Sequence, residues 1–551
     1  MNADRPSTLR TPELSSSYLR VRLPAFVRDE RLWVALCYLA LVALFFWPSF
    51  WSGALPLPLM NPYVQPDPIW AGQAPANTVV GANRLLGDVS GFYFPYLSFT
   101  IDSLRAGQFP LWNPGLFGGM PFFAANQAAQ LYPVNLVAFW FGPHYYWLVA
   151  PLLRLLIAGF GTYALARRMN VGALGALLAG GVYMFASFNV VWLHFAIHNV
   201  AALLPLALWL IARLADRVAR RDVLALAGVV AAQMLGGHPE MSLFFMVVCG
   251  AFAAVWLPWR RPTTDERRPT NDGFIEDRGS RIEDSVSSAP TLLSSIFNLL
   301  SSLVAGRSSA VALAVALGLA LSAVQWVPTI DLIGKSSTLH ERSFAADRGR
   351  TPAADFAPLG GVPRASWENL RHWLLLVAPE LWGMPAGEQI RNWLPERTNY
   401  NEMASYFGLV ALPLALVGAL RGRHRRAAWF FGLLSLLSLL LLYPLPGLYR
   451  IGYLPLLDVA YGFRFGQGIA LGGAMLAGLG LDRLIGAGPR VRLTLALALA
   501  ALAALNFAVV FTLMGGAPIS WALGFAPDDA ARAAIVAVYT PGNWRLFLPA
   551  A

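Results

Sequence analysis

Long apolar segments alternate with short polar stretches along most of the chain. Many of these segments approach the roughly 20 apolar residues that a helix needs to cross the hydrocarbon core of a bilayer. The pattern predicts an all-α polytopic membrane protein with about 11 transmembrane helices. We expect the spans near residues 32–51, 146–166, 171–192, 200–211, 223–235, 241–257, 311–327, 407–420, 427–443, 466–481 and 493–514.

Composition and charge agree with a membrane location. Only 13% of the residues are charged, whereas a soluble domain carries about 25%. The net charge of +11 comes almost entirely from arginines in short runs between apolar segments, such as those at Arg167, Arg213, Arg260 and Arg421. These runs fall on one predicted side, as the positive-inside rule requires of cytosolic loops. A nucleic-acid-binding protein is excluded, because it needs its basic residues gathered on one binding face.

The same alternation predicts the domain organisation, with the N-terminus in the cytosol and the C-terminus outside. We expect no signal peptide before the first span, which would be an uncleaved anchor. Both cysteines lie in apolar segments, so no disulfide framework is expected. The predicted segments are a cytosolic tail (1–31), an N-terminal membrane module (32–258) with an outer loop (52–145), a polar cytosolic linker (259–307), a C-terminal membrane module (308–516) with an outer region (328–405), and an outer C-terminal segment (517–551).

The long outer loop is rich in Gly, Pro, Trp, Asn and Tyr, so polar chemistry is expected there. Pro95 and Gly107 frame a short helix in it, because proline favours helix starts and glycine favours helix ends. Leu97, Ile101 and Leu104 share one face of that helix. We therefore expect an amphipathic helix that lies on the membrane surface.

Asp88 lies just before this helix, close to Phe92 and Tyr93. A carboxylate among aromatic side chains at the membrane edge would be partly desolvated, which raises its basicity and suits a general base. The alternative is a structural aspartate that caps the helix or closes a turn. Asp102 and Arg105 are spaced i, i+3, and we expect them to form an ordinary surface ion pair.

A series of motifs runs through the outer loop and continues at later span ends. They are Asp88 with Tyr93-Phe94-Pro95, Leu104-Arg105-Ala106-Gly107, Pro110-Leu111-Trp112-Asn113-Pro114, Phe117-Gly118-Gly119-Met120-Pro121, Asn126-Gln127, Tyr132-Pro133-Val134-Asn135, Gly236-Gly237-His238-Pro239, Asn401-Glu402 with Tyr406-Phe407-Gly408, and Phe463-Arg464-Phe465. This series closely resembles the YfhO-like family of bacterial membrane proteins, which looks like a branch of the GT-C glycosyltransferase superfamily.

The resemblance covers nearly the whole membrane region and implies a GT-C-like fold in the bacterial cytoplasmic membrane. It implies transfer of a sugar from a polyprenyl-phosphate donor to an envelope glycan, lipid or protein acceptor on the outer face. Asp88 aligns with the first-loop acid of GT-C enzymes and would be the catalytic base. A single carboxylate suits an inverting displacement, since the lipid phosphate leaves without a strong acid.

Two further residues receive roles, each with a structural alternative. Arg464 stands at the outer end of a span and would bind the donor phosphate. The alternative is an arginine that only snorkels to the membrane interface. Glu402 would contact the acceptor or, together with Asp88, a divalent cation. Its alternative role is to cap the span expected to start near Ala404.

Other outer residues are expected to line the substrate pocket, namely Arg105, Trp112, Asn113, Gln127, Tyr132 and His238. Aromatic belts at the membrane interface explain Trp and Tyr equally well, and His238 is equally a turn histidine beside Pro239. His194 and His198 have the i, i+4 spacing of zinc ligands but no glutamate between them as in a metalloprotease motif. We expect interface histidines there and no metal site.

Two other classes of protein compete with the enzyme. One is a transporter or flippase for lipid-linked glycans, and the other is a non-catalytic scaffold for envelope assembly. A transporter is expected to place ionisable residues near the midplane of broken helices. The charges singled out above lie at the outer rim, which favours the enzyme.

Overall fold

The computed structural model describes residues 29–58, 86–258, 306–335, 365–379 and 400–514, without 423, 449, 451–453, 455–461 and 486. Within these ranges the chain forms helices and loops, and the only β contact there is an isolated bridge between Asn113 and Met120. Most of the predicted tail, linker and outer region, and the whole predicted C-terminal segment, lie outside the described residues.

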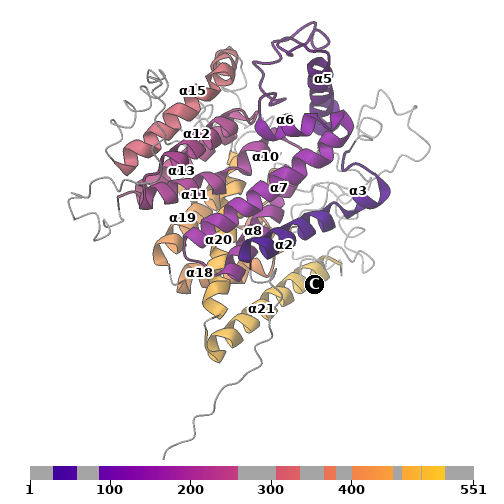
Figure 1. The fold of residues 1–551 in the computed structure, drawn as a ribbon. Helices are drawn as coiled ribbons and strands as arrows, with labels where there is room; N and C mark the ends of the chain where they lie inside the picture. Colours follow the sequence, from indigo (N-terminus) through magenta and orange to yellow (C-terminus); the bar gives the residue numbers. More distant parts are fainter. Residues whose placement is uncertain are drawn as a thin grey trace, which may run out of the picture.

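The helices of the first half follow one another closely. They are α2 (Glu30–Phe45), α3 (Trp47–Ser52), the π-helical turn η3 (Val89–Tyr93), α5 (Phe94–Arg105), α6 (Pro133–Phe139), α7 (Gly142–Arg168), α8 (Ala173–Phe185), α9 (Ser187–Val191), α10 (Ala196–Ala201), α11 (Leu204–Asp216), α12 (Arg220–Met234) and α13 (Pro239–Trp256). The later helices are α15 (Arg307–Gly334), the 3-10 helix η5 (Trp367–Leu376), α18 (Ala411–Arg421), α19 (Arg425–Leu442), the 3-10 turn η7 (Gly462–Phe465), α20 (Gly466–Ile485) and α21 (Pro489–Met514). Figure 1 shows α15 against α12 at one edge of the bundle and α21 near α18 at another.

The predicted class, an α-helical polytopic membrane protein, is confirmed by the length and composition of the helices. Among the described residues, 7 helices are long and apolar enough to cross a membrane. The other predicted spans are also helical but shorter or less apolar, since α2 has 16 residues and α12 has 15. A total of about 11 spans therefore stays a prediction. The 7 are Gly142–Arg168, Ala173–Val191, Ala196–Asp216, Pro239–Trp256, Arg307–Gly334, Arg425–Leu442 and Gly466–Ile485.

Local sequence explains where several helices begin and end. Proline occupies the first turn of α5, α6, α7, α11 and α13. There its missing amide N–H has no helical partner to lose, and its fixed φ suits a helix. After α7 the chain turns at Asn170, whose φ is +61°. Asparagine adopts this left-handed conformation more readily than most residues, so the α7–α8 turn is short.

The two predicted membrane modules pack directly against each other through α20. This helix contacts α18 and α19 of its own half and α8 of the first half. A Cβ added to Gly175 in α8 would lie 2.6 Å from the carbonyl oxygen of Gly478 in α20, and the reverse distance is the same. Small residues allow such close approach in a membrane, where apolar side chains gain little by leaving lipid.

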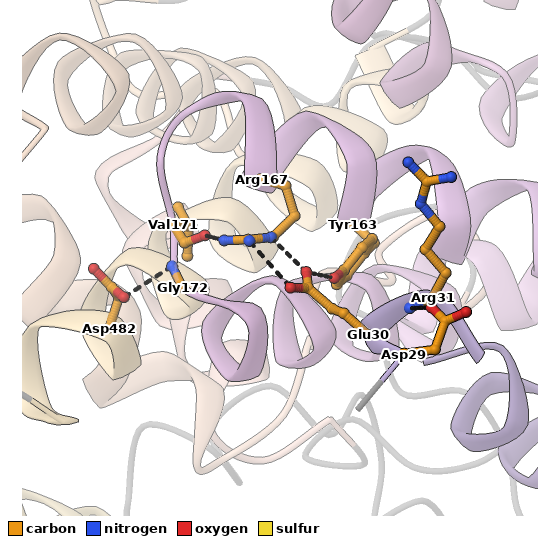
Figure 2. Close-up of polar contacts among 8 residues, drawn as sticks. All are labelled: Asp29, Glu30, Arg31, Tyr163, Arg167, Val171, Gly172 and Asp482. Carbon is orange, nitrogen blue, oxygen red and sulfur yellow. Dashed lines mark hydrogen bonds and ion pairs between the residues drawn. The ribbon is translucent and has the colours of Figure 1, made fainter. Parts of the chain in front are cut away.

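One end of the bundle gathers several arginines from different helices. Figure 2 shows that Arg167, at the end of α7, lies 2.7 Å from the Glu30 carboxylate of α2, which also accepts a hydrogen bond from Tyr163. Gly172 donates its backbone N–H to Asp482 of α20 at 2.8 Å. We call this end the arginine-rich face, and its arginines are Arg167, Arg168, Arg213, Arg425 and Arg426.

The opposite end of the bundle carries the outer loop. We call it the loop face and define it by residues 86–132 and the first turns of α7, α13 and α20. The 27 residues of α7 join the two faces, which corresponds to a length of about 40 Å at 1.5 Å per residue. The candidate site lies on the loop face.

Candidate functional site

Tyr93 lies at the centre of the polar groups on the loop face. Its side chain is buried, and its hydroxyl donates a hydrogen bond of 3.2 Å to the Oε1 atom of Gln127. Its ring packs edge-to-face on Phe195, with the ring centroids 5.3 Å apart. The π-helical turn before α5 thus holds the hydroxyl in place against the segment between α9 and α10.

Asp88 and Arg464 both act electrostatically on Tyr93. Burial raises the pKa of the Tyr93 hydroxyl above its ordinary value, and the negative charge of Asp88 raises this pKa further. The positive charge of Arg464 opposes the increase. The two residues predicted as base and phosphate ligand therefore act with opposite sign on the same tyrosine.

Arg464 is held by protein groups on two sides. Its Nε atom lies 3.2 Å from Oε2 of Glu240, and its guanidinium carbon lies 5.2 Å from the centroid of the Trp192 ring. Its side chain is only 13% exposed. The Arg464 side chain is therefore held by protein contacts, while its depth relative to the membrane interface stays a prediction.

His238 caps α13 immediately beside this ion pair. Its Nδ1 atom accepts a hydrogen bond of 3.2 Å from the backbone N–H of Met241. Burial, and then the positive charge of Arg464, hold the pKa of His238 well below its ordinary value. A neutral capping histidine matches the interpretation of His238 as a turn residue, and its ring lies within electrostatic reach of Arg464.

The turn before His238 packs directly on the outer loop. Gly237 has a φ of +87°, and an added Cβ would lie 2.8 Å from the carbonyl oxygen of Asn126 and 3.0 Å from the Cβ of Ala129. Only glycine adopts this backbone conformation without cost and also leaves room for the loop. The Gly236-Gly237-His238-Pro239 motif therefore brings the start of α13 against Asn126 and Ala129.

Asp88 differs from both of its predicted environments. It is exposed, so the expected partial desolvation among aromatic side chains is wrong. It precedes η3 but makes no side-chain capping hydrogen bond, so the capping interpretation is also wrong. The physical reason is that Asp88 already has helical φ and ψ angles, which turn its side chain away from the amides that it would cap. The carboxylate is open to an incoming molecule.

Glu402 lies in a half-buried segment that passes beside the start of α20. An added Cβ on Gly466 would lie 3.2 Å from the carbonyl oxygen of Ala404, and Ser187 donates its N–H to the carbonyl oxygen of Tyr406 at 2.8 Å. The segment that carries Glu402 thus passes beside the start of α20 at Ala404. Its predicted capping role is wrong, because α18 begins at Ala411 and not near Ala404.

Other predicted pocket residues lie elsewhere on the outer loop or inside the bundle. Asn113 is buried and accepts a hydrogen bond of 2.9 Å from the N–H of Gly115, which makes it a turn residue. Trp112 is exposed and covers Gly119. Arg105 is exposed on α5, with its guanidinium against Gly142. Tyr132 is fully buried and donates to the carbonyl oxygen of Asn199 at 2.9 Å.

The predicted helix between Pro95 and Gly107 exists as α5, but its environment differs from the prediction. Leu97 and Ile101 are 4% and 1% exposed and pack into the protein core. The apolar face therefore contacts protein and not the membrane surface. The predicted ion pair between Asp102 and Arg105 does not form, although both side chains are described and exposed.

Sequence reasoning missed Arg154, which lies in the middle of α7. It is 1% exposed, and its Nη1 atom donates to Oδ1 of Asn199 at 2.8 Å and to the carbonyl oxygen of Phe195 at 3.4 Å. Its Nε atom donates to the carbonyl oxygen of Ala150 at 3.1 Å. No described carboxylate forms an ion pair with it. The sequence signal for Arg154 is an arginine inside an apolar span. Burying such a charge in a membrane costs free energy, so these residues usually have a function.

One of the two histidines near Arg154 differs from the prediction. His198 is 0% exposed and lies in the interior, so it is not an interface histidine. His194 lies between two candidate spans, and burial followed by the charge of Arg154 lowers its pKa to about 3. Among the described residues, no group of three or more His, Cys, Asp or Glu side chains is placed to hold a metal ion.

The fold and this site define an α-helical polytopic membrane protein with a polar cluster on its loop face. No family model, curated protein or solved structure matches the chain. The cluster comprises Asp88, Tyr93, Gln127, His238, Glu240 and Arg464.

Proposed function

We propose that the protein is a GT-C-like glycosyltransferase of the bacterial cytoplasmic membrane. It would take a sugar from a polyprenyl-phosphate donor and pass it to an envelope glycan, lipid or protein acceptor. The observation that supports the proposal is an exposed carboxylate, Asp88, together with a guanidinium, Arg464, that Glu240 and Trp192 hold on the same loop face, with both charges acting on Tyr93. The proposal further includes about 11 spans, with the arginine-rich face in the cytosol and the loop face outside.

In the proposed reaction, Asp88 accepts the proton of the acceptor hydroxyl. The hydroxyl oxygen then forms a bond to the anomeric carbon of the sugar, and the bond from that carbon to the phosphate oxygen breaks. The polyprenyl phosphate leaves with the bonding electrons, and the anomeric configuration inverts. A base near the acceptor lowers the barrier for this step, and the exposed Asp88 carboxylate is accessible to an acceptor hydroxyl.

Arg464 would bind the donor phosphate before the reaction and the released phosphate after it. A guanidinium presents several N–H donors in one plane, so it can contact both Glu240 and a phosphate oxygen. The Glu240 carboxylate and the Trp192 ring hold Arg464 in position without a bound donor. Such preorganisation reduces the entropy lost when the donor binds.

A divalent cation between Asp88 and Glu402 is a secondary part of this proposal. Carboxylate oxygens are the ligands that Mg²⁺ and Ca²⁺ prefer. Of the predicted pocket residues Trp112, Gln127, Tyr132 and His238, only Gln127 and His238 belong to the loop-face cluster. Addition of a chelator to the purified protein tests the cation directly, since activity that survives it would exclude a metal-dependent step.

The deciding experiment measures sugar transfer and donor hydrolysis with a synthetic polyprenyl-phosphate-hexose pool. Wild type is compared with Asp88→Asn and with Asp102→Asn, which removes another exposed acid of the same loop. Activity should disappear in Asp88→Asn and persist in Asp102→Asn. Full activity of Asp88→Asn would overturn the role of Asp88, and no donor binding by wild type would overturn the glycosyltransferase.

Arg464 is tested by donor binding. Arg464→Ala should bind the donor at least tenfold more weakly than wild type, as expected for loss of a charge-assisted hydrogen bond of about 1.5 kcal/mol or more. The donor affinity of Arg464→Lys should lie between those of wild type and Arg464→Ala. Arg450→Ala is the matched control, because Arg450 is an exposed arginine of the preceding loop. Equal binding by all four proteins would contradict the proposed phosphate contact.

Arg154 supports a second candidate function, a transporter or flippase for lipid-linked glycans. It is an ionisable residue in the middle of a candidate span, beside the unwound segment between α9 and α10. Transporters place their substrate sites at such interrupted helices. Reconstitution into vesicles separates the two functions. Movement of a fluorescent polyprenyl-phosphate sugar between leaflets, lost in Arg154→Gln but kept in Asp88→Asn, would favour the transporter.

A further inference from the structure

A second polar pocket lies on the arginine-rich face, at the other end of the bundle from the candidate site. It encloses about 200 Å³, and three separate chain segments form its wall. These are the end of α7 with the following turn, the end of α13, and the start of α19. The lining residues are Arg168, Met169, Asn170, Trp256, His424, Arg425, Arg426 and Ala427.

The wall of this pocket is positively charged. It contains three arginines and a histidine, and no acidic residue is among the described residues that line it. Arg168 forms an ion pair with Asp216, which lies outside the wall. Arg425 is exposed at the rim. By contrast, the neighbouring Arg167 is neutralised by Glu30, as Figure 2 shows. The described side chains of the wall therefore include more basic than acidic groups.

Trp256 fixes one of these arginines at the pocket floor. The guanidinium carbon of Arg426 lies 4.4 Å from the centroid of the Trp256 ring, and Arg426 also donates to the carbonyl oxygen of Val255. The Trp256 ring in turn stacks on Phe252, with centroids 4.4 Å apart. A guanidinium stacked on an aromatic ring retains N–H donors in its plane for an anion. The Trp256 ring thus helps to position the arginine at the pocket.

The start of α19 adds backbone donors to the same wall. The first helical hydrogen bond of this end runs from Ala428 N to His424 O. The amides of Arg425, Arg426 and Ala427 precede it, and amides in the first turn of a helix have no helical carbonyl to bind. They also carry the positive end of the helix dipole. Together with the arginine side chains, they favour an oxyanion such as phosphate.

The surface beside the pocket identifies the source of that phosphate. Further along α19, Trp429 is 77% exposed and Leu433 is 54% exposed. Both belong to a candidate span, so these side chains face lipid. A molecule with an anionic headgroup and apolar chains would place the headgroup in the pocket and its chains along α19. A free phosphate ion would use only the pocket.

We propose that this pocket binds the headgroup phosphate of an anionic phospholipid from the leaflet at the arginine-rich face. Basic pockets between transmembrane helices commonly bind anionic headgroups. This inference does not rest on the proposed glycosyltransferase activity, because the pocket lies on the opposite face from Asp88 and Arg464. Failure of one proposal therefore leaves the other unaffected.

Titration of purified full-length protein in a neutral detergent tests the site. The probes are dioctanoyl phosphatidylglycerol, dioctanoyl phosphatidylcholine and inorganic phosphate, and binding is read from the rise in thermal unfolding temperature. The pocket variant is Arg425→Gln/Arg426→Gln. The matched control is Arg217→Gln/Arg221→Gln, which removes the same charge from exposed positions outside the pocket wall.

Phosphatidylglycerol should stabilise wild type and the control at similar concentrations. The pocket variant should need at least about tenfold more of this lipid, as expected when charge-assisted hydrogen bonds are lost. Phosphatidylcholine should have a weaker effect on all three proteins. Equal weakening in pocket and control variants would overturn the site, and stabilisation by inorganic phosphate as effective as that by phosphatidylglycerol would overturn the lipid. The variant Arg425→Lys/Arg426→Lys keeps both positive charges and should bind phosphatidylglycerol better than the glutamine variant. Such a result would show that the glutamine variant loses affinity in a folded pocket and not through damage to α19.

Discussion

The Nε atom of Arg464 lies 3.2 Å from the Oε2 atom of Glu240, although the two residues are 224 positions apart in the chain. The contact joins the turn before α20 to the first turn of α13. It fixes the charge that we assign to donor binding, and it places that charge beside His238 and Trp192. The loop-face cluster therefore depends on packing between the two halves of the protein.

The first prediction concerns this ion pair. Glu240→Gln should destabilise the protein by about 1 kcal/mol, between the values for exposed and buried pairs. The Arg464 side chain is 13% exposed and that of Glu240 is 36% exposed, so solvent screens the pair only in part. Thermal unfolding in detergent measures the effect. The double variant Glu240→Gln/Arg464→Gln should lose less than the sum of the single variants, and strict additivity would show that the two side chains are not coupled.

The second prediction concerns Gly237. Gly237→Ala should destabilise by about 2 kcal/mol or more, because alanine at positive φ is strained and the new Cβ meets Asn126. Gly250→Ala is the matched control. Gly250 lies within α13 with no atom near an added Cβ, so alanine there should stabilise by about 0.5–1 kcal/mol. Unfolding temperatures of the two variants should move in opposite directions, and a shift of the same sign would refute the close packing of the turn.

The third prediction concerns pH. The pKa of His238 is about 6.5 in an unfolded chain and well below this value in the folded protein. Below about pH 6.5 the unfolded chain binds a proton that the folded protein does not, so stability falls as the pH decreases and is unaffected above that value. The loss is at most about 1.4 kcal/mol per pH unit.

His238→Asn isolates this effect, because asparagine can still cap α13. Unfolding temperatures of both proteins are compared near pH 7 and near pH 5. Other buried histidines, such as His372 with its lowered pKa, affect both proteins equally. The wild type should lose more stability on acidification than the variant. Identical losses would mean that His238 is protonated in the folded state.

The fourth prediction concerns Arg154. Arg154→Leu should destabilise by about 2–4 kcal/mol, because it leaves the oxygens of Asn199, Phe195 and Ala150 buried without their donor. Arg154→Lys keeps one donor group but loses the planar guanidinium fork, so it should lose less stability than Arg154→Leu. Thermal unfolding ranks the three proteins. An Arg154→Leu variant as stable as wild type would show that Arg154 is retained for function and not for structure.

The sequence predicted the positions of helices well, because apolar length and proline or glycine punctuation are local signals. α5 lies between Pro95 and Gly107 as expected. Its environment was not predictable in the same way. Leu97 and Ile101 form an apolar face that suits lipid and protein equally, and only the tertiary packing of the outer loop decides that they are buried.

The composition of the site was predicted only in part. Asp88, Gln127, His238 and Arg464 were singled out as candidates, and they lie in one cluster. Glu240 was not assigned to Arg464, because no local pattern connects residues so far apart. Arg154 was overlooked because the surrounding leucines carry the hydropathy of the span, whereas a single charge inside it is the informative feature.

The ion pair between Arg464 and Glu240 has a consequence for the synthesis and membrane insertion of the protein. After Glu240 leaves the ribosome, 224 further residues must be synthesised before Arg464 follows. At about 5–20 residues per second, this takes roughly 10–45 s. During that interval the first half of the chain is in the membrane. The Glu240 carboxylate does not yet have Arg464 as its partner, and α8 does not yet have α20 to pack against. Until α20 is made, newly inserted α8 therefore exposes to lipid the face around Gly175 that later packs against Gly478.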